Sequence, residues 1–150
     1  MKTFDDSLPM LLYRALNTVM PEFRNLFAGF GVTEPQWRVL RVLWEESEIS
    51  VRELSARTLL LAPSLVGVLD RLENAGLVER HRSQADRRQV LVRLTPAGTA
   101  LQSDVNPRVD EIYREIEAAM DSDTYNHLVN GLQALAGTNL TTQQDAVNDE

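Results

Sequence analysis

The sequence predicts a mainly α-helical protein that carries one small β-hairpin. Apolar residues recur every three or four positions over most of the chain, a spacing typical of amphipathic helices. Ser/Thr-x-x-Glu/Gln pairs, which cap helix N-termini, precede two of these segments. Between residues 78 and 94 the period changes to two, as expected for paired strands.

Length and composition are those of a single globular domain covering residues 1–150, with 43% hydrophobic and 25% charged residues. The chain has no cysteine, which excludes disulfides, thiolate metal sites and cysteine redox sensing. With only two histidines, His81 and His127, we expect no metal and no other cofactor. The N-terminus lacks a signal-peptide pattern and no apolar run is long enough to span a bilayer, so a cytoplasmic location is predicted.

Two helices are expected in the first third of the chain. An apolar stripe predicts the first helix over residues 7–30, with a local bend at Pro21. The stripe consists of Leu8, Leu12, Ala15, Val19, Phe23, Leu26 and Phe30. Thr33 and Gln36 have the spacing of a capping box, so the second helix should run over residues 34–46.

Two shorter helices should follow. Ser50 and Glu53 repeat the capping-box spacing and predict a helix that continues to about Thr58. The next helix should begin near Pro63 and end at Gly76, because proline suits a first turn and glycine a left-handed end. Its apolar stripe consists of Leu65, Val68, Leu69 and Leu72.

A hairpin is expected next, followed by the C-terminal helices. Alternating residues predict strands over about 78–82 and 90–94, joined by the polar loop SQADRR. Thr95 should cap a long helix, and apolar stripes predict a long and a short helix over about 100–136. Residues 138–150 have little to bury and are predicted to be a disordered tail.

Positive charge gathers in the middle of an acidic chain. The formal net charge is −7 overall, but −2 over residues 1–50, +3 over 51–101 and −8 over 102–150. The densest basic cluster is RSQADRRQV, residues 82–90, in the expected hairpin loop. Such a local field attracts an anionic partner irrespective of distant charges. A solvated basic face without a partner is the alternative that charge alone leaves open.

Three helices followed by a basic hairpin form the winged helix-turn-helix arrangement. The second helix of the helix-turn-helix is narrow enough to lie in the major groove of DNA. The hairpin beside it can reach the backbone or the adjacent minor groove, where an arginine meets concentrated negative potential. The recognition helix should expose Ser64, Gly67 and Arg71. We therefore predict double-stranded DNA as a partner.

The stretch LDRLENAGLVERHRSQADRRQVLVRLTPAGTAL resembles the signature of the MarR family of bacterial regulators. The matching motifs are Asp70–Arg71–Leu72, Gly76–Leu77–Val78, Asp86 with Arg88, and Leu94–Thr95 with Gly98. Within the family, SLPMLLYRA, TEPQWRVLRVL and LAPSLVGVLDRL are similar to the regulators of homoprotocatechuate degradation. Gly67 departs from the pattern, because many members carry a larger polar or basic residue there. We therefore expect little direct base readout, and more of the discrimination between DNA sequences should come from groove shape.

The resemblance implies a homodimer formed by the helices at about 7–30 and 100–136. Each subunit would present one winged helix-turn-helix, at about 34–99, to a pseudo-palindromic operator with half-sites roughly 10 bp apart. It also implies that Arg88 enters the minor groove, oriented by Asp86. Arg52, Arg82 and Arg87 are the candidates for phosphate contacts. The full set of expected DNA-binding residues is Arg52, Pro63, Ser64, Gly67, Arg82, Asp86, Arg87 and Arg88.

The family resemblance also implies that a small ligand, often an aromatic acid, relieves repression. Trp37 and Arg41 lie one turn apart on the second expected helix, and Arg14 on the first could join them. An aromatic wall with a guanidinium suits an aromatic carboxylate. Packing in the core is the alternative role for Trp37.

Other interpretations remain open beside the DNA-binding repressor. A winged-helix module that binds an acidic protein is one alternative. We predict no enzymatic activity, because the sequence shows no nucleophile–base pair, glycine-rich phosphate loop or metal cluster. Two arginines have alternative partners within the chain: Asp70 for Arg71, and Glu73 or Glu79 for Arg80.

Overall fold

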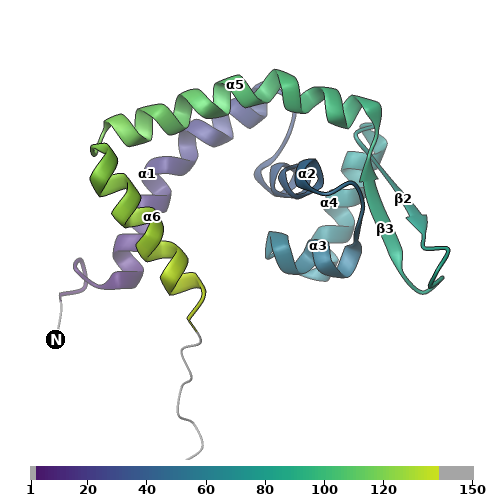
Figure 1. The fold of residues 1–150 in the computed structure, drawn as a ribbon, viewed down its shortest axis with the longest axis horizontal. Coiled ribbons are helices and arrows are strands. Elements are labelled where there is room, and N and C mark those ends of the chain that lie inside the picture. Colours follow the sequence, from purple (N-terminus) through teal and green to yellow (C-terminus); the bar gives the residue numbers. More distant parts are fainter. Residues whose placement is uncertain (1–2, 139–150) are drawn as a thin grey trace, which may run out of the picture. The chain divides into compact units, whose positions relative to one another are not determined.

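The computed structural model describes residues 3–138 and confirms a mainly helical fold with a small hairpin (Figure 1). In chain order the elements are α1 (Leu8–Gly29), α2 (Glu34–Glu45), β1 (Ile49–Ser50), α3 (Val51–Thr58), α4 (Ala62–Asn74), β2 (Val78–Arg82), β3 (Val90–Leu94), α5 (Pro96–Ala118) and α6 (Ser122–Ala136). The predicted disordered tail lies outside the described residues, apart from Thr138. Among residues 3–138, none of the helices has the length and hydropathy of a membrane span.

The chain divides into two compact units, residues 1–112 and 113–150. The first unit contains α1 to α4, the sheet and most of α5, and the second contains the end of α5 and α6. The three helices and the hairpin that the sequence predicts to bind DNA therefore lie in one unit. That the whole chain forms a single domain stays a prediction.

Local capping fixes the starts of α2 and α3, as the sequence predicted. The Thr33 amide donates to Oε1 of Gln36 over 2.8 Å, and the Gln36 amide donates back to Oγ1 of Thr33 over 3.5 Å. The Ser50 amide donates to Oε2 of Glu53 over 3.3 Å, and the Glu53 amide donates to Oγ of Ser50 over 3.2 Å. Each box satisfies donors that a helix N-terminus would otherwise leave unpaired.

The sheet has three antiparallel strands in the order β1-β3-β2. The hairpin register pairs Val78 with Leu94 and Arg82 with Val90, which confirms the two predicted strands. β1 was not predicted, because two residues are too few to show a period; Ile49 pairs with Val92. The loop of the hairpin points away from helices α2, α3 and α4 (Figure 1).

The core of the first unit lies between α2, α3, α4 and the sheet. Its largest fully buried side chains are Leu40, Leu43, Leu54, Leu65, Leu69 and Leu72. The first turn of α5 packs closely on the turn after α4, since a Cβ at Gly98 would lie 2.1 Å from the carbonyl oxygen of Leu77. Thr95 caps this turn by accepting from the Gly98 amide over 3.1 Å, as predicted. Gly76, with φ +72°, follows α4 in the left-handed region.

Helix α1 continues through Pro21, and its two halves differ in burial. Phe23 and Phe27 in the C-terminal half are buried. The leucines of the N-terminal half are exposed by 36% to 53%: Leu8, Leu11, Leu12 and Leu16. The apolar stripe of α1 is therefore only partly used within this chain.

Candidate nucleic-acid interface

The wing is the hairpin of β2 and β3, and hydrogen bonds within its loop fix the shape of that loop. Ser83 is buried, and its Oγ accepts from the amides of Ala85 over 3.2 Å and Asp86 over 3.3 Å. The Ser83 amide donates to the Gln89 carbonyl over 3.0 Å, and the Gln89 amide donates to the Asp86 carbonyl over 2.9 Å. The arginines that follow Asp86 are thus carried on a closed turn.

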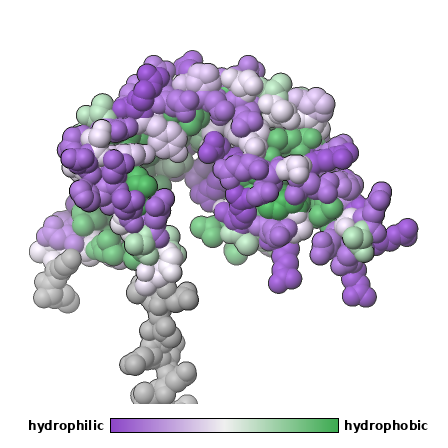
Figure 2. All heavy atoms as spheres, in the orientation of Figure 1, coloured by the Kyte–Doolittle hydropathy of each residue, from purple (hydrophilic) through white to green (hydrophobic). Residues whose placement is uncertain are grey.

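Asp86 and Arg82 contact the neighbouring arginines of the loop through the backbone atoms of those arginines and not through the guanidinium groups of those arginines. Oδ1 of Asp86 accepts from the backbone amide of Arg88 over 3.0 Å, so Asp86 positions the backbone of Arg88. Nη1 of Arg82 donates to the Arg87 carbonyl over 2.9 Å, so Arg82, a predicted phosphate contact, also braces the loop. The side chains of Arg87 and Arg88 are exposed, and hydrophilic side chains project from the hairpin tip (Figure 2).

A hollow of about 510 Å³ lies between the start of α3, the side of α4 and the wing. Its lining includes Arg52, Val66, Arg80, Asp86, Arg88 and Gln89. Three of the predicted DNA-binding residues, Arg52, Asp86 and Arg88, are therefore brought together. Pro63 and Ser64 are exposed on α4 and Gly67 is half-buried there, but none of the three lines the hollow.

Arg71 is exposed on α4, the recognition helix. An ideal Cβ at Gly67 would be 3.8 Å from Nη2 of Arg71, so the guanidinium lies over Gly67, one turn toward the helix N-terminus. The ion pair with Asp70 that the sequence suggested is not formed, because Asp70 pairs with Arg80 at 2.6 Å. Sequence reasoning left Arg71 out of the DNA-binding set; its exposure now places it among the candidates.

Arg80 fastens the recognition helix to the wing. Its Nη2 donates to Oδ1 of Asp70 and to Oε2 of Glu73, both over 2.6 Å. Hydrogen bonds from the Arg80 side chain and amide hold the pKa of Glu73 below its ordinary value. The expected pairing with Glu73 is confirmed, whereas Glu79 pairs with Arg93 at 2.5 Å. Arg80 is therefore neutralised within the protein, although it lines the hollow.

Four other arginines, of which Arg52 and Arg88 line the hollow, differ from Arg80 in their partners. Within residues 3–138, no ion pair is formed by Arg52, Arg71, Arg87 or Arg88. They come from α3, α4 and the wing loop. Unpaired guanidinium groups on three adjoining elements suit the phosphates and base edges of an anionic polymer. The described residues contain no group of acidic or histidine side chains that could hold a metal ion.

The residues predicted for ligand binding are only partly brought together. The ring of Trp37 stacks on Phe27, with centroids 4.3 Å apart, and meets Trp44 edge-on at 5.1 Å. Trp37 is half-buried, so it packs in an aromatic cluster and still presents part of its surface. Arg41 is exposed, and its Nη2 is 3.8 Å from Oε1 of Glu45. Trp37 and Arg41 thus share α2, one turn apart.

Arg14 lies elsewhere on helix α1. It is exposed and forms an ion pair with Asp5. Phe27, which stacks on Trp37, follows Arg14 by thirteen residues of the same helix, or about 20 Å along its axis. Within one chain, Arg14 is therefore not placed beside Trp37.

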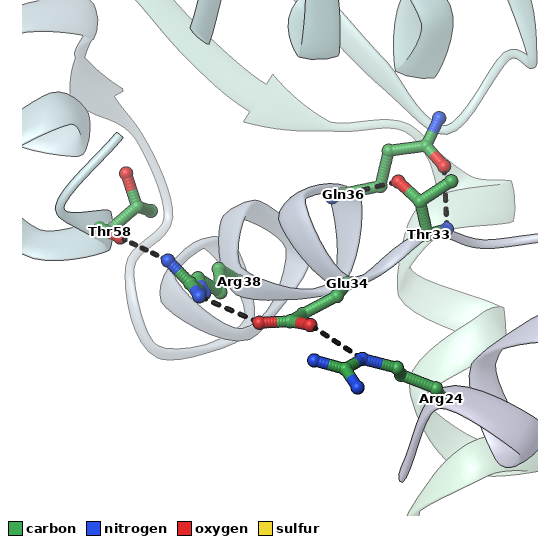
Figure 3. Close-up of polar contacts among 6 residues, drawn as sticks. All are labelled: Arg24, Thr33, Glu34, Gln36, Arg38 and Thr58. Atoms are coloured by element: carbon green, nitrogen blue, oxygen red, sulfur yellow. Dashed lines mark hydrogen bonds and ion pairs between the residues drawn. The ribbon is translucent and has the colours of Figure 1, made fainter. Parts of the chain in front are cut away.

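Sequence reasoning missed an ion-pair network at the start of α2 (Figure 3). The carboxylate of Glu34 accepts from Nη2 of Arg38 over 2.7 Å and from Nε of Arg24 over 3.1 Å. Nη1 of Arg38 donates to the Thr58 carbonyl at 3.5 Å, at the end of α3. Burial raises the pKa of Glu34, but hydrogen bonds from Arg38 and Arg24 outweigh it, so the pKa lies below its ordinary value. The network joins α1, α2 and α3.

Comparison with known proteins agrees with this geometry. Residues 30–89 match the model of the MarR family. The chain is 33% identical over 144 residues to the homoprotocatechuate degradative operon repressor of Escherichia coli, covering 96% of this chain and 97% of that protein. It is similar to the structure of the transcriptional regulator PA4135, with a TM-score of 0.83, 32% identity and coverage of 89% and 98%. It is also similar to NadR in complex with 4-hydroxyphenylacetate, with a TM-score of 0.78, 32% identity and coverage of 93% and 99%.

Proposed function

Because this chain belongs to the MarR family, we propose that it represses transcription as a homodimer and that a small aromatic acid relieves the repression. The family assigned from sequence motifs is confirmed, and the chain is a DNA-binding repressor, not an enzyme. The homodimer, the individual contacts and the ligand are the parts that we propose. A cytoplasmic location belongs to the same proposal, since the protein acts on DNA.

The unpaired arginines of α3, α4 and the wing loop are the observation that carries the DNA-binding arrangement. In the proposed complex α4 lies in the major groove and the wing reaches the adjacent minor groove. Arg88, held on a closed turn by Asp86, enters the minor groove. Arg52 at the start of α3 meets a phosphate between the two.

Exposed apolar side chains on both terminal helices support the homodimer. The N-terminal half of α1 exposes Leu8 by 51%, Leu11 by 50% and Leu16 by 53%. On α6, Leu128 is exposed by 42% and Leu132 by 39%. Rows of this kind are costly in water, and a second copy of the chain would cover them. Two-fold symmetry then gives two half-sites roughly 10 bp apart.

The side chains near Trp37 and the ligands of related proteins both support an aromatic acid as the ligand. NadR was crystallised with 4-hydroxyphenylacetate, and the relative from Escherichia coli represses the operon for degrading homoprotocatechuate. In this chain Arg41 is exposed and only loosely held by Glu45, and the half-buried ring of Trp37 lies one turn away. We infer that the guanidinium binds the carboxylate and that the indole packs on the ring. Arg14 stays a prediction.

A mobility-shift titration tests the DNA-binding part, using duplex DNA from upstream of the gene that encodes this chain. The logarithm of the affinity should fall linearly with the logarithm of the salt concentration, because phosphate contacts release counterions. Absence of any salt-sensitive shift would contradict this part and favour a module that binds an acidic protein.

Tryptophan fluorescence tests the ligand part, since Trp37 and Trp44 are the chain's two tryptophans. Titration with 4-hydroxyphenylacetate should change the emission and weaken the DNA shift. The matched amide, which lacks the negative charge, should bind much more weakly, and Arg41→Ala should abolish the difference between acid and amide. Equal binding of acid and amide by the wild type would rule out the role of Arg41.

A further inference from the structure

The first two turns of the recognition helix expose almost no polar side chains. Ala62 and Pro63 are exposed, Val66 is 48% exposed, and Gly67 has no side chain. Ser64 is the one polar side chain in these two turns. An exposed valine on a helix otherwise anchored by four buried apolar residues adds little to the packing of the domain.

Polar side chains farther along α4 replace little of this missing polar surface. Asp70 is held by Arg80 at 2.6 Å, and Glu73 is held by the same guanidinium. Arg71 starts two turns from Pro63 and extends its guanidinium only as far as Gly67. Bidentate reading of a base edge needs Arg, Lys, Asn or Gln, and Asp or Glu can accept from the cytosine amino group. Apart from Ser64 and the guanidinium of Arg71 over Gly67, the first two turns therefore offer the bases only van der Waals contact.

An apolar side chain in the major groove has one distinctive target, the C5 methyl group of thymine. Position 67 has no side chain of its own and the guanidinium of Arg71 lies over it, so Val66, 48% exposed, is the apolar side chain that this part of α4 offers to the groove. We propose that the methyl groups of Val66 contact a thymine methyl, so that each operator half-site requires a thymine at that position. This inference rests on the proposed function and adds to it the base and the side chain that reads it.

Uracil supplies a test that alters one methyl group of the DNA and nothing in the protein. Selection from random duplex DNA with the full chain would first give an enriched sequence. Synthetic duplexes of that sequence would then carry uracil in place of each thymine in turn. In each half-site one replacement should weaken wild-type binding about fourfold, the factor expected for removing one buried methyl group from the contact.

Two variants test whether the preference for thymine over uracil comes from the side chain of Val66. Val66→Ala should bind the thymine and uracil duplexes equally, because the contact is already lost. Leu59→Ala is the matched control: Leu59 is apolar and 83% exposed, but it lies in the turn before α4. This variant should keep the full fourfold preference. Thermal unfolding would verify that both variants are folded, and the wild-type comparison requires no variant.

The possible results separate this inference from the function on which it rests. If wild type binds the thymine and uracil duplexes equally at every position, Val66 does not read a thymine methyl, and the repressor function stands. The thymine contact is equally contradicted if Val66→Ala retains the full preference. If no sequence is enriched over the starting pool, sequence-specific binding itself is contradicted.

Discussion

Two groups of arginines in the first 112 residues differ in their partners. On α3, α4 and the wing loop, no ion pair within residues 3–138 holds Arg52, Arg71, Arg87 or Arg88. On α1 and α2 each arginine has a carboxylate: these are Arg14, Arg24, Arg38 and Arg41. An arginine in an ion pair contributes to the stability of the fold. An exposed arginine without one adds little to stability, and its charge is available to an anionic ligand such as DNA. Pairing therefore distinguishes the arginines proposed to bind DNA from those of α1 and α2, among which Arg41 is held only loosely, at 3.8 Å from Glu45.

The largest effect should come from the tip of the wing. Arg88→Ala should weaken operator binding by about 1–3 kcal/mol, because the variant loses the groove contact. Its unfolding free energy should change by less than about 0.5 kcal/mol, since Arg88 has no carboxylate partner among the described residues to lose. Fluorescence anisotropy with labelled operator and thermal unfolding would measure the two quantities.

Arg93→Ala is the matched control on the same hairpin. Arg93 is exposed on β3 and paired with Glu79, away from the loop. Its operator affinity should stay close to that of the wild type. Equal losses in the two variants would mean that the hairpin acts through general charge, and the minor-groove role of Arg88 would be wrong.

Arg52→Ala should have a smaller and less selective effect. Loss of one phosphate contact should weaken operator and unrelated DNA alike, by roughly 1 kcal/mol, and reduce the salt slope by about 1. Arg57, on the same helix but paired with Glu45 and Glu46, supplies the control, and Arg57→Ala should keep the slope. A slope unchanged in Arg52→Ala would remove Arg52 from the interface.

A substitution in the ion-pair network of α1 and α2 should instead lower stability and leave DNA binding unchanged. Glu34→Gln loses the charge that Arg24 and Arg38 share, so the unfolding free energy should fall by up to about 1 kcal/mol at pH 7. Operator affinity should be unaffected at neutral pH. Denaturant unfolding and anisotropy would measure both. A variant of wild-type stability with weakened DNA binding would break the contrast between the two regions.

The stability difference between wild type and Glu34→Gln should depend on pH. The pKa of Glu34 in the folded protein lies below its ordinary value of 4.5, so the stabilisation is present above about pH 4.5. It should be lost as the pH falls through the lowered pKa. The stability gap between wild type and Glu34→Gln should therefore shrink below pH 4.5. A gap that grows toward acid would contradict the assignment of the pKa shift to these arginines.

The smallest effect is expected at Arg41. Its pairing with Glu45 is long, at 3.8 Å, and both side chains are exposed, so Arg41→Ala should change stability by less than about 0.5 kcal/mol. Operator affinity without ligand should also be unchanged. A clear loss of either would give Arg41 a structural or DNA-binding role and weaken its assignment to the ligand.

Local spacing in the sequence was enough for most of the elements and for the wing. The capping pairs Thr33–Gln36 and Ser50–Glu53 and the glycine after α4 act within three or four residues, so their geometry can be read along the chain. The same holds for the turn that carries Arg88, whose amide is held by a carboxylate two residues away. The strand β1 was missed because its only signal is the pairing with β3.

The chain's sequence by itself thus determined the family, the order of helices and hairpin, and the basic loop. Only the tertiary structure decided which charges are neutralised. Arg80 and Arg71 both had acidic candidates nearby in sequence, but folding brings Asp70 and Glu73 to Arg80 and leaves Arg71 over Gly67. The physical reason is range: a cap depends on backbone geometry three residues away, whereas an ion pair depends on which distant elements the core brings together.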